Sequence, residues 1–204
     1  MSRFYEEWWK NNKLYVQEDF SYKWPAIKPL LPKEENIIFL DYGCGSGKIL
    51  EEIISINPNN KYIGIDVSKE ALKRAERKKI NAKFYLTADG KRIPLKTGSI
   101  DFVTALDVIE HVYDTKTAFQ EFHRILKRGG RIIISTPYHS LIKNLFIIFL
   151  GFEKVFDPLG HHIRFFTVQS LTRCMKLSGF KIEKIGYFGR FFPLWRGFYI
   201  VAKK

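Results

Sequence analysis

Short hydrophobic runs alternate with amphipathic stretches along most of this chain, and the two patterns predict different elements. The apolar runs predict strands at residues 36–41, 61–66, 83–87, 99–105, 130–135, 180–187 and 197–203. The amphipathic stretches between them predict helices at residues 47–56, 69–79, 115–127 and 167–178. Regular alternation of this kind indicates an α/β fold, in which a largely parallel sheet is covered by helices on both faces.

Both ends of the chain depart from this alternation. The last two predicted strands are joined only by residues 189–194, which is too short for a helical crossover, so we expect them to run antiparallel. Residues 1–34 predict a helical segment of short helices or loops, interrupted by Pro25, Pro29 and Pro32. We therefore expect a single domain, residues 1–204, that begins with this N-terminal segment.

The alternation also breaks after the fifth predicted strand, at an insertion of residues 138–166. Within it, residues 141–152 are apolar nearly all round. This run is too short to cross a bilayer, which takes about 20 residues. Two interpretations remain open: a lid-like helix packed on the domain, or a helix that covers an apolar substrate or makes peripheral contact with a membrane.

Composition narrows the class of protein further. The chain has 204 residues and two cysteines, Cys44 and Cys174, which are too few for a disulfide framework. Together with an N-terminus that lacks the pattern of a signal peptide, they predict a cytoplasmic protein. The net charge of +13 could attract nucleic acid, anionic lipid or an acidic substrate, or could reflect only a lysine-rich sequence.

A glycine-rich segment, Asp41-Tyr42-Gly43-Cys44-Gly45-Ser46-Gly47, follows the first predicted strand. Its glycines allow the backbone to lie against a ligand, next to the free N–H groups of a helix N-terminus. The spacing fits neither the dinucleotide pattern G-x-G-x-x-G nor a P-loop. Asp66 ends the second predicted strand, where a carboxylate can accept two ribose hydroxyls. The pattern favours a nucleoside ligand without phosphates.

This segment looks like the first motif of the class I S-adenosylmethionine-dependent methyltransferases. Four later segments resemble further motifs of that family in the same order: residues 64–68, 87–90, 101–112 and 126–137. The resemblance covers residues 35–204. Within that family, the chain is similar to the ubiquinone-biosynthesis O-methyltransferases and to general small-molecule methyltransferases. The resemblance implies a Rossmann-like, doubly wound sheet of seven strands, mostly parallel, with the last strand antiparallel.

The resemblance also implies which residues bind S-adenosylmethionine. Asp66 would hold the ribose hydroxyls, Val67 would pack beside the adenine, and Asp89 would accept from the adenine amine. The full set of implied cofactor-binding residues is Asp41, Gly43, Cys44, Gly45, Gly47, Asp66, Val67, Asp89, Gly90 and Leu106.

A second group of polar residues, Asp107, Glu110 and His111, has the spacing i, i+3, i+4, so the three would share one face if this segment is helical. Such a set can bind a divalent metal, or the imidazole can act as a base. Metal-using methyltransferases with a similar pattern begin it with Glu, whereas this chain has Asp107. We therefore expect no metal, a catalytic His111 that lines the acceptor pocket, and a structural Glu110.

The end of the insertion carries His161, His162 and Arg164. By the resemblance, the His residues could contact the acceptor or complete a metal set with His111. A rigid loop, with His and Arg bonded to backbone carbonyls, is an equal alternative. Aromatic residues near the N-terminus, Trp8, Trp9 and Trp24, could fold over the donor or cover the sheet edge.

The predicted function is methyl transfer from S-adenosylmethionine to the oxygen of a small-molecule or lipid-like acceptor. An RNA methyltransferase is an alternative favoured by the charge, but the segment Leu106-Asp107-Val108-Ile109 lacks the Asn-Pro-Pro-Tyr type of signature found in amino-group enzymes. A non-catalytic, cofactor-binding regulator is a second alternative. The glycine spacing argues against a nicotinamide-dependent oxidoreductase.

Overall fold

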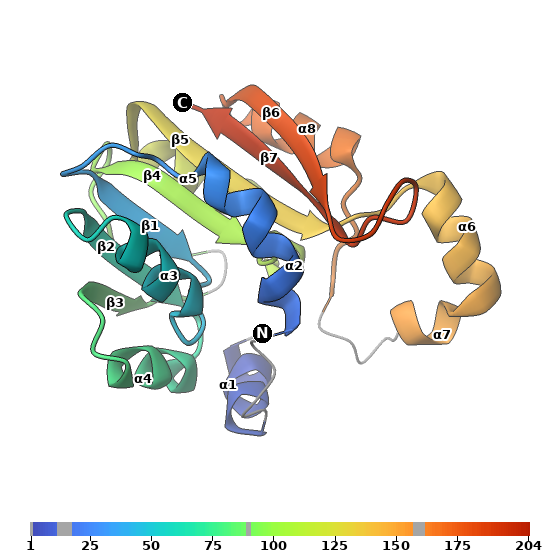
Figure 1. Cartoon of the computed structure of the whole chain (residues 1–204), viewed down its shortest axis with the longest axis horizontal. Helices are drawn as coiled ribbons and strands as arrows, with labels where there is room; N and C mark the ends of the chain where they lie inside the picture. Colours follow the sequence, from blue (N-terminus) through green and yellow to red (C-terminus); the bar gives the residue numbers. More distant parts are fainter. Residues whose placement is uncertain (1, 12–17, 89–90, 157–161) are drawn as a thin grey trace.

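A seven-stranded sheet forms the centre of the molecule (Figure 1). The computed structural model describes residues 2–11, 18–88, 91–156 and 162–204. Its strands are β1 (Ile38–Tyr42), β2 (Lys61–Asp66), β3 (Ala82–Leu86), β4 (Ile100–Leu106), β5 (Leu126–Pro137), β6 (Lys181–Phe188) and β7 (Gly197–Lys203). Their order in the sheet is β3-β2-β1-β4-β5-β7-β6.

The pairing of the strands confirms the predicted topology. Strands β3, β2, β1, β4 and β5 pair in parallel, whereas β7 is antiparallel to both of its neighbours, β5 and β6. The short connection between the last two strands therefore returns β7 into the gap beside β5. Because β1 lies between β2 and β4, the strand order reverses beside β1, which is where open α/β sheets bind ligands.

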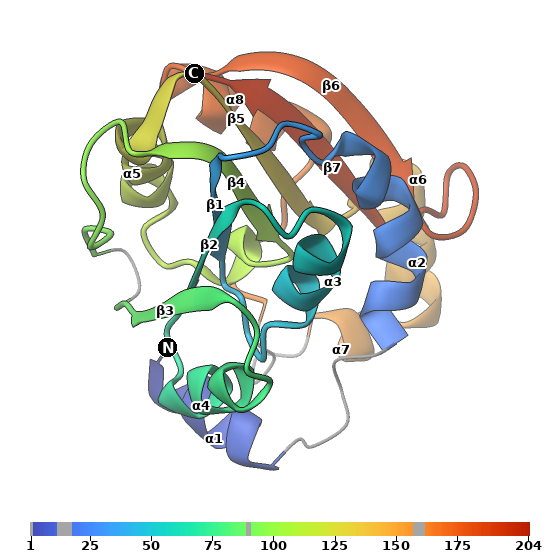
Figure 2. The same ribbon diagram turned by 60° about the vertical axis from the view of Figure 1, so that its left-hand side comes forward.

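Two layers of helices cover the sheet. Helices α5 (Thr115–Ile125) and α8 (Val168–Leu177) bury Phe119, Phe122, Leu171 and Met175 against one face. Helices α2 (Glu18–Ile27), α3 (Lys48–Ile56) and α4 (Lys69–Arg77) contribute Ile27, Leu50, Ile53 and Leu72 to the core on the other face. Figure 2 shows α2 and α3 in front of the sheet and α8 behind it.

The N-terminal segment and strand β5 differ in detail from the prediction. The chain begins with helix α1 (Ser2–Asn11), and Pro25 lies inside α2, which is followed by the 3-10 helix η1 (Lys28–Leu30). A proline removes only one backbone donor, and burial of Ile27 in the core stabilises this turn. Strand β5 begins at Leu126, because Leu126 already pairs with Ile100 before a register shift.

The insertion after β5 contains helices α6 (Leu141–Leu150) and α7 (Phe152–Val155), which project from one end of the sheet (Figure 1). Among the described residues, no helix is both long enough and apolar enough to span a membrane. The interpretation of residues 138–166 as a lid stays a prediction.

Candidate functional site

A cavity of about 490 Å³ lies at the carboxyl ends of β1, β2 and β4. This volume is within the range of small-molecule sites. Eight of the residues proposed from the sequence to bind the cofactor or to act in catalysis or acceptor binding line it: Gly43, Cys44, Gly45, Asp66, Val67, Leu106, His111 and His162. Segments that are far apart in the sequence therefore share one cavity.

The glycine loop is held in a shape that only glycine can adopt without strain. The N–H groups of Gly43 and Cys44 both donate to the carbonyl of Ile65, at 2.7 and 3.0 Å, so the loop folds back across β2. Gly43 has a φ of +77°, and a Cβ atom there would lie 2.3 Å from Cγ2 of Val108. The loop therefore presents bare backbone to the cavity.

Asp66 ties this loop to the end of β2. One carboxylate oxygen accepts from the N–H of Gly45 at 2.8 Å, and the other accepts from the N–H of Ser68 at 2.9 Å. Burial raises the pKa of Asp66, although these hydrogen bonds oppose the rise. Each oxygen keeps a second lone pair, so the carboxylate can still accept hydroxyl donors from the cavity.

Asp41 does not line the cavity. It is buried beneath the loop, where one oxygen accepts from the hydroxyl of Thr104 at 2.7 Å. The other oxygen has no hydrogen-bond partner among the described residues. Burial raises the pKa of Asp41 to about 7, and the charge of Asp66 adds to the rise. Any contribution of Asp41 to cofactor binding would therefore be indirect.

Replacing Asp41 by asparagine is expected to stabilise the protein at alkaline pH. An unfolded aspartate ionises near pH 3.9. The raised pKa in the folded state therefore lowers stability as the pH climbs from about 4 to about 7, and the whole cost persists above that. Asparagine keeps the bond from Thr104 and carries no charge. Urea denaturation measures the gain in unfolding free energy of the variant over the wild-type protein. That gain should be larger at about pH 8 than at about pH 5, by a difference on the order of a few kcal/mol. Equal changes at both pH values would contradict the raised pKa.

The expectation that Asp107, Glu110 and His111 share one helix face is wrong. Only residues Ile109–His111 are helical, in the 3-10 helix η2. Asp107 precedes it with a φ of +54° and forms an ion pair with Lys23 of α2. Its other oxygen accepts from the hydroxyl of Ser135 at 2.6 Å. Burial alone would raise the pKa of Asp107, but these partners hold it below its ordinary value.

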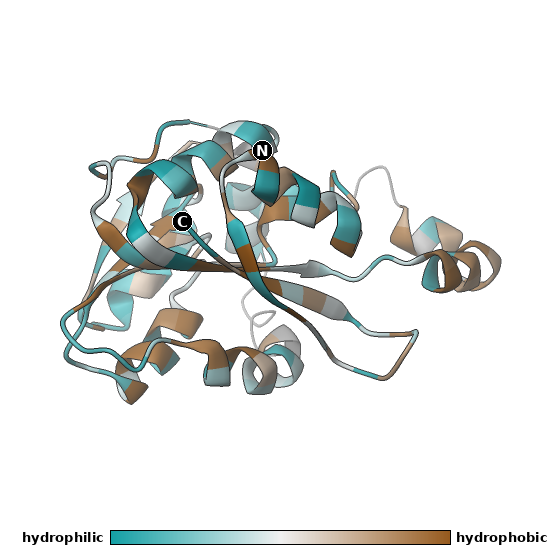
Figure 3. Cartoon of the chain, turned by 90° about the horizontal axis from the view of Figure 1, so that it is seen from above, coloured by the Kyte–Doolittle hydropathy of each residue, from teal (hydrophilic) through white to brown (hydrophobic). Residues whose placement is uncertain are grey.

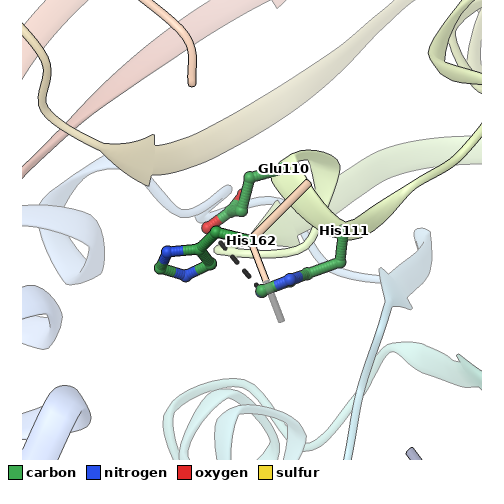
Figure 4. Close-up of side chains that lie close together, drawn as sticks. All are labelled: Glu110, His111 and His162. Carbon is green, nitrogen blue, oxygen red and sulfur yellow. Dashed lines mark ion pairs between the residues drawn. The ribbon is translucent and has the colours of Figure 1, made fainter. Parts of the chain in front are cut away.

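Glu110, His111 and His162 form a compact cluster (Figure 4). One potential ligand atom from each lies within 4.8 Å of the others, and the two imidazole rings are 4.9 Å apart. The backbone brings them together, because the N–H groups of Ile163 and Arg164 donate to the carbonyl of Glu110. Burial, reinforced by the charge of Asp107, raises the pKa of Glu110 well above its ordinary value. This donor set could hold a divalent cation, so the expected absence of a metal stays a prediction.

The other proposed site residues lie elsewhere. Arg164 donates to the carbonyls of Val112 and Tyr113, so its guanidinium fixes the loop and does not line the cavity. This matches the rigid-loop alternative. Gly47 is the N-cap of helix α3, in the left-handed conformation, and its N–H donates to the carbonyl of Cys44 at 2.8 Å. Asp89, Gly90 and His161 lie outside the described residues.

Helix α1 contributes residues that the sequence motifs did not include. Tyr5, Trp8 and Trp9 line the cavity, and Glu6 accepts from the hydroxyl of Ser68 at 2.8 Å. Lys23 and Tyr22 also line the cavity from α2, and no sequence signal pointed to them. The N-terminal aromatic residues were the available signal for α1. Trp24, in contrast, packs against the core.

Comparison with known proteins shows similarity to methyltransferases. A family model described as a methyltransferase domain matches residues 40–134. An uncharacterized protein of Methanocaldococcus jannaschii is 32% identical over 130 residues, covering 64% of this chain and 56% of the relative. A ubiquinone biosynthesis O-methyltransferase of Pelagibacter ubique is 28% identical over 189 residues, covering 79% of this chain and 72% of the relative.

Among solved structures, an S-adenosylmethionine-dependent methyltransferase of Thermotoga maritima has a TM-score of 0.74 at 23% identity and covers 100% of this chain and 97% of that one. The chain spans only 56%, 29% and 48% of the lengths of three curated relatives that it matches. Residues 40–134 therefore match the methyltransferase domain family, and the chain shares the fold of solved S-adenosylmethionine-dependent methyltransferases.

Proposed function

We propose that this protein is an enzyme that transfers the methyl group of S-adenosylmethionine to a small-molecule acceptor. One observation carries the proposal: a single cavity is lined both by the glycine loop with Asp66 and by His111 with His162. Donor-binding groups and a group able to move a proton therefore face the same space. The match of residues 40–134 to the methyltransferase domain family supports this activity.

The residues of the chain would position the donor. Its sulfonium supplies an activated methyl group when it is bound. The bare backbone of the glycine loop leaves room for the methionine and ribose parts, and Asp66 accepts from the ribose hydroxyls. Val67 and Leu106 offer apolar surface at the ends of β2 and β4. Asp89 and Gly90 stay proposals from the sequence motifs alone.

The methylated atom is proposed to be an oxygen. His111 would accept the proton of an acceptor hydroxyl as the oxygen lone pair bonds to the methyl carbon, while the bond from that carbon to sulfur breaks and S-adenosylhomocysteine leaves. His162 would help to orient the imidazole of His111. Aromatic side chains, including Tyr5, Trp8 and Phe20, line the cavity and suit an acceptor with an apolar body. A lipid-like acceptor and peripheral membrane contact through residues 141–152 would be consistent with these walls.

Donor binding provides the first test. S-adenosylhomocysteine should raise the melting temperature by mass action, whereas NAD should not. Replacing Asp66 by asparagine should weaken S-adenosylhomocysteine binding, because a bond to a charged acceptor contributes about 1.5–3 kcal/mol. That corresponds to a dissociation constant roughly 10 to 150 times higher by calorimetry.

The contact with the ribose can be separated from the support that Asp66 gives to the loop. A 2′-deoxy analogue of S-adenosylhomocysteine should bind the wild-type protein more weakly, but should lose little further affinity in Asp66→Asn. Independent, additive losses would remove Asp66 from the ribose site. Tighter binding of NAD than of S-adenosylhomocysteine would overturn the proposed donor.

A further inference from the structure

The polar side chains of helix α6 face the protein, whereas a surface helix usually turns its polar side chains to water. The ammonium group of Lys143 donates to the carbonyls of Tyr138 and Trp195, at 2.7 and 2.9 Å. The side chain of Asn144 bonds to the ring of His139 at 3.1 Å. Lys143 is the single charged residue of this helix. Polar contacts, rather than an apolar face, therefore hold α6 against the domain.

Seven of the eight apolar side chains of α6 are exposed, and only Ile147 is half-buried. Leu141, Phe149 and Leu150 are 77%, 81% and 82% exposed. The large apolar side chains of this helix that are exposed are Leu141, Ile142, Leu145, Phe146, Ile148, Phe149 and Leu150. A helix at a water-facing surface normally buries its apolar stripe. Figure 3 shows this hydrophobic helix standing out from the end of the molecule.

The β6–β7 loop extends the same surface. Phe191 and Phe192 are 71% and 64% exposed, and the loop is bonded to α6 through the carbonyl of Trp195. This loop carries Arg190 and Arg196 and no acidic residue. Burial, together with the charge of the nearby Arg190, lowers the pKa of Lys143 to about 8. Arg190 and Lys143 are therefore two basic side chains that lie close together beside the apolar residues. We call the seven exposed residues of α6, with Phe191 and Phe192, the apolar tip.

We propose that the apolar tip inserts into the headgroup region of an anionic phospholipid membrane. Apolar surface of this extent is rarely left in water. The helix has 10 residues and is about 15 Å long, so it can lie in the interface but cannot span it. A lipid layer closes around a convex projection, whereas a protein partner would need a matching groove. The charge of +13 complements anionic headgroups.

This docking would place the cavity next to the membrane. Pro137, which leads into α6, and Arg196, which ends the β6–β7 loop, both line the cavity. The two segments that form the apolar tip thus begin and end at the site. An acceptor dissolved in the lipid could then enter the cavity without crossing water. This consequence rests on the proposed function.

Vesicle flotation of the whole chain tests the proposal without any turnover. Wild-type protein should float with vesicles of phosphatidylcholine and phosphatidylserine at low salt, and less so at high salt or with phosphatidylcholine alone. Phe149→Glu should reduce binding roughly tenfold or more, because it puts a charge in place of a large apolar group that would be buried in the lipid of the bound state. Leu177→Glu is a matched control, since Leu177 is 78% exposed at the end of α8.

Three outcomes would overturn the proposal. One is no flotation of the wild-type protein at low salt, and another is an equal loss of binding in Leu177→Glu. The third is that the wild-type protein forms a dimer and does not bind vesicles, and that Phe149→Glu dissociates this dimer. A second copy of the chain would then cover the apolar tip. Equal melting temperatures of the variants would show that the fold is retained. Donor binding is measured separately, so failure of docking and failure of the proposed activity are distinguishable.

Discussion

Replacing His111 by asparagine is expected to lower kcat by about 100-fold to 10,000-fold, the usual contribution of a positioned acid or base. The imidazole lines the cavity and its side chain is 15% exposed, so it is within reach of an acceptor hydroxyl. The dissociation constant of S-adenosylhomocysteine should change little, because the loop and Asp66 are left intact. Labelled-donor kinetics on an identified acceptor, together with calorimetry, provide the measurement.

Two controls distinguish a role of His111 as the catalytic base from its other possible roles. His123→Asn removes an imidazole from α5 that packs against Phe180, and it should leave kcat within about twofold. Chelator treatment of the wild-type protein should leave turnover intact. If chelation removed activity and Mg²⁺ or Zn²⁺ restored it, Glu110, His111 and His162 would be metal ligands instead. An unchanged kcat in His111→Asn would exclude His111 from catalysis.

The sheet and the glycine loop could be predicted from the sequence because both are encoded locally. Each strand is a short apolar run, and the run alone is long enough to predict a strand without information from other parts of the chain. Gly43 needs a positive φ, and Asp66 ends a strand next to it in the sheet, so motif and geometry coincide. The antiparallel pairing of β6 with β7 followed from the length of one connection, and the resemblance implied that β7 is the strand that opposes the others.

The rest of the site depends on contacts between distant segments. The ion pair of Lys23 with Asp107 joins α2 to the end of β4, and nothing in the local sequence of either residue indicates it. Asp107 lies before η2, so the condition under which its spacing would place it on a helical face with Glu110 and His111 is not met. For α6, an almost uniformly apolar run could not show which side faces the protein. Its orientation is set by Lys143 and by the carbonyls of two other segments.

Replacing Gly43 by alanine is expected to destabilise the protein and to abolish measurable donor binding. The left-handed conformation costs about 1–2 kcal/mol for a residue with a Cβ atom. A steric clash adds to this, because the new atom would lie 2.3 Å from Cγ2 and 2.8 Å from Cγ1 of Val108. Overpacking of that kind costs about 1–3 kcal/mol, so urea denaturation should show a total loss of roughly 2–5 kcal/mol.

Gly98→Ala supplies the matched control for the backbone term. Gly98 has a φ of +62°, close to that of Gly43, but a Cβ atom there would meet no atom within 4 Å. It should therefore show the conformational cost alone. Adding Val108→Ala to Gly43→Ala should relieve the clash, and it should recover more stability than the sum of the single effects predicts. If Gly43→Ala and Gly98→Ala were equally stable, Val108 could move aside. The close approach of Val108 to the glycine loop would then not be what shapes the donor side of the cavity.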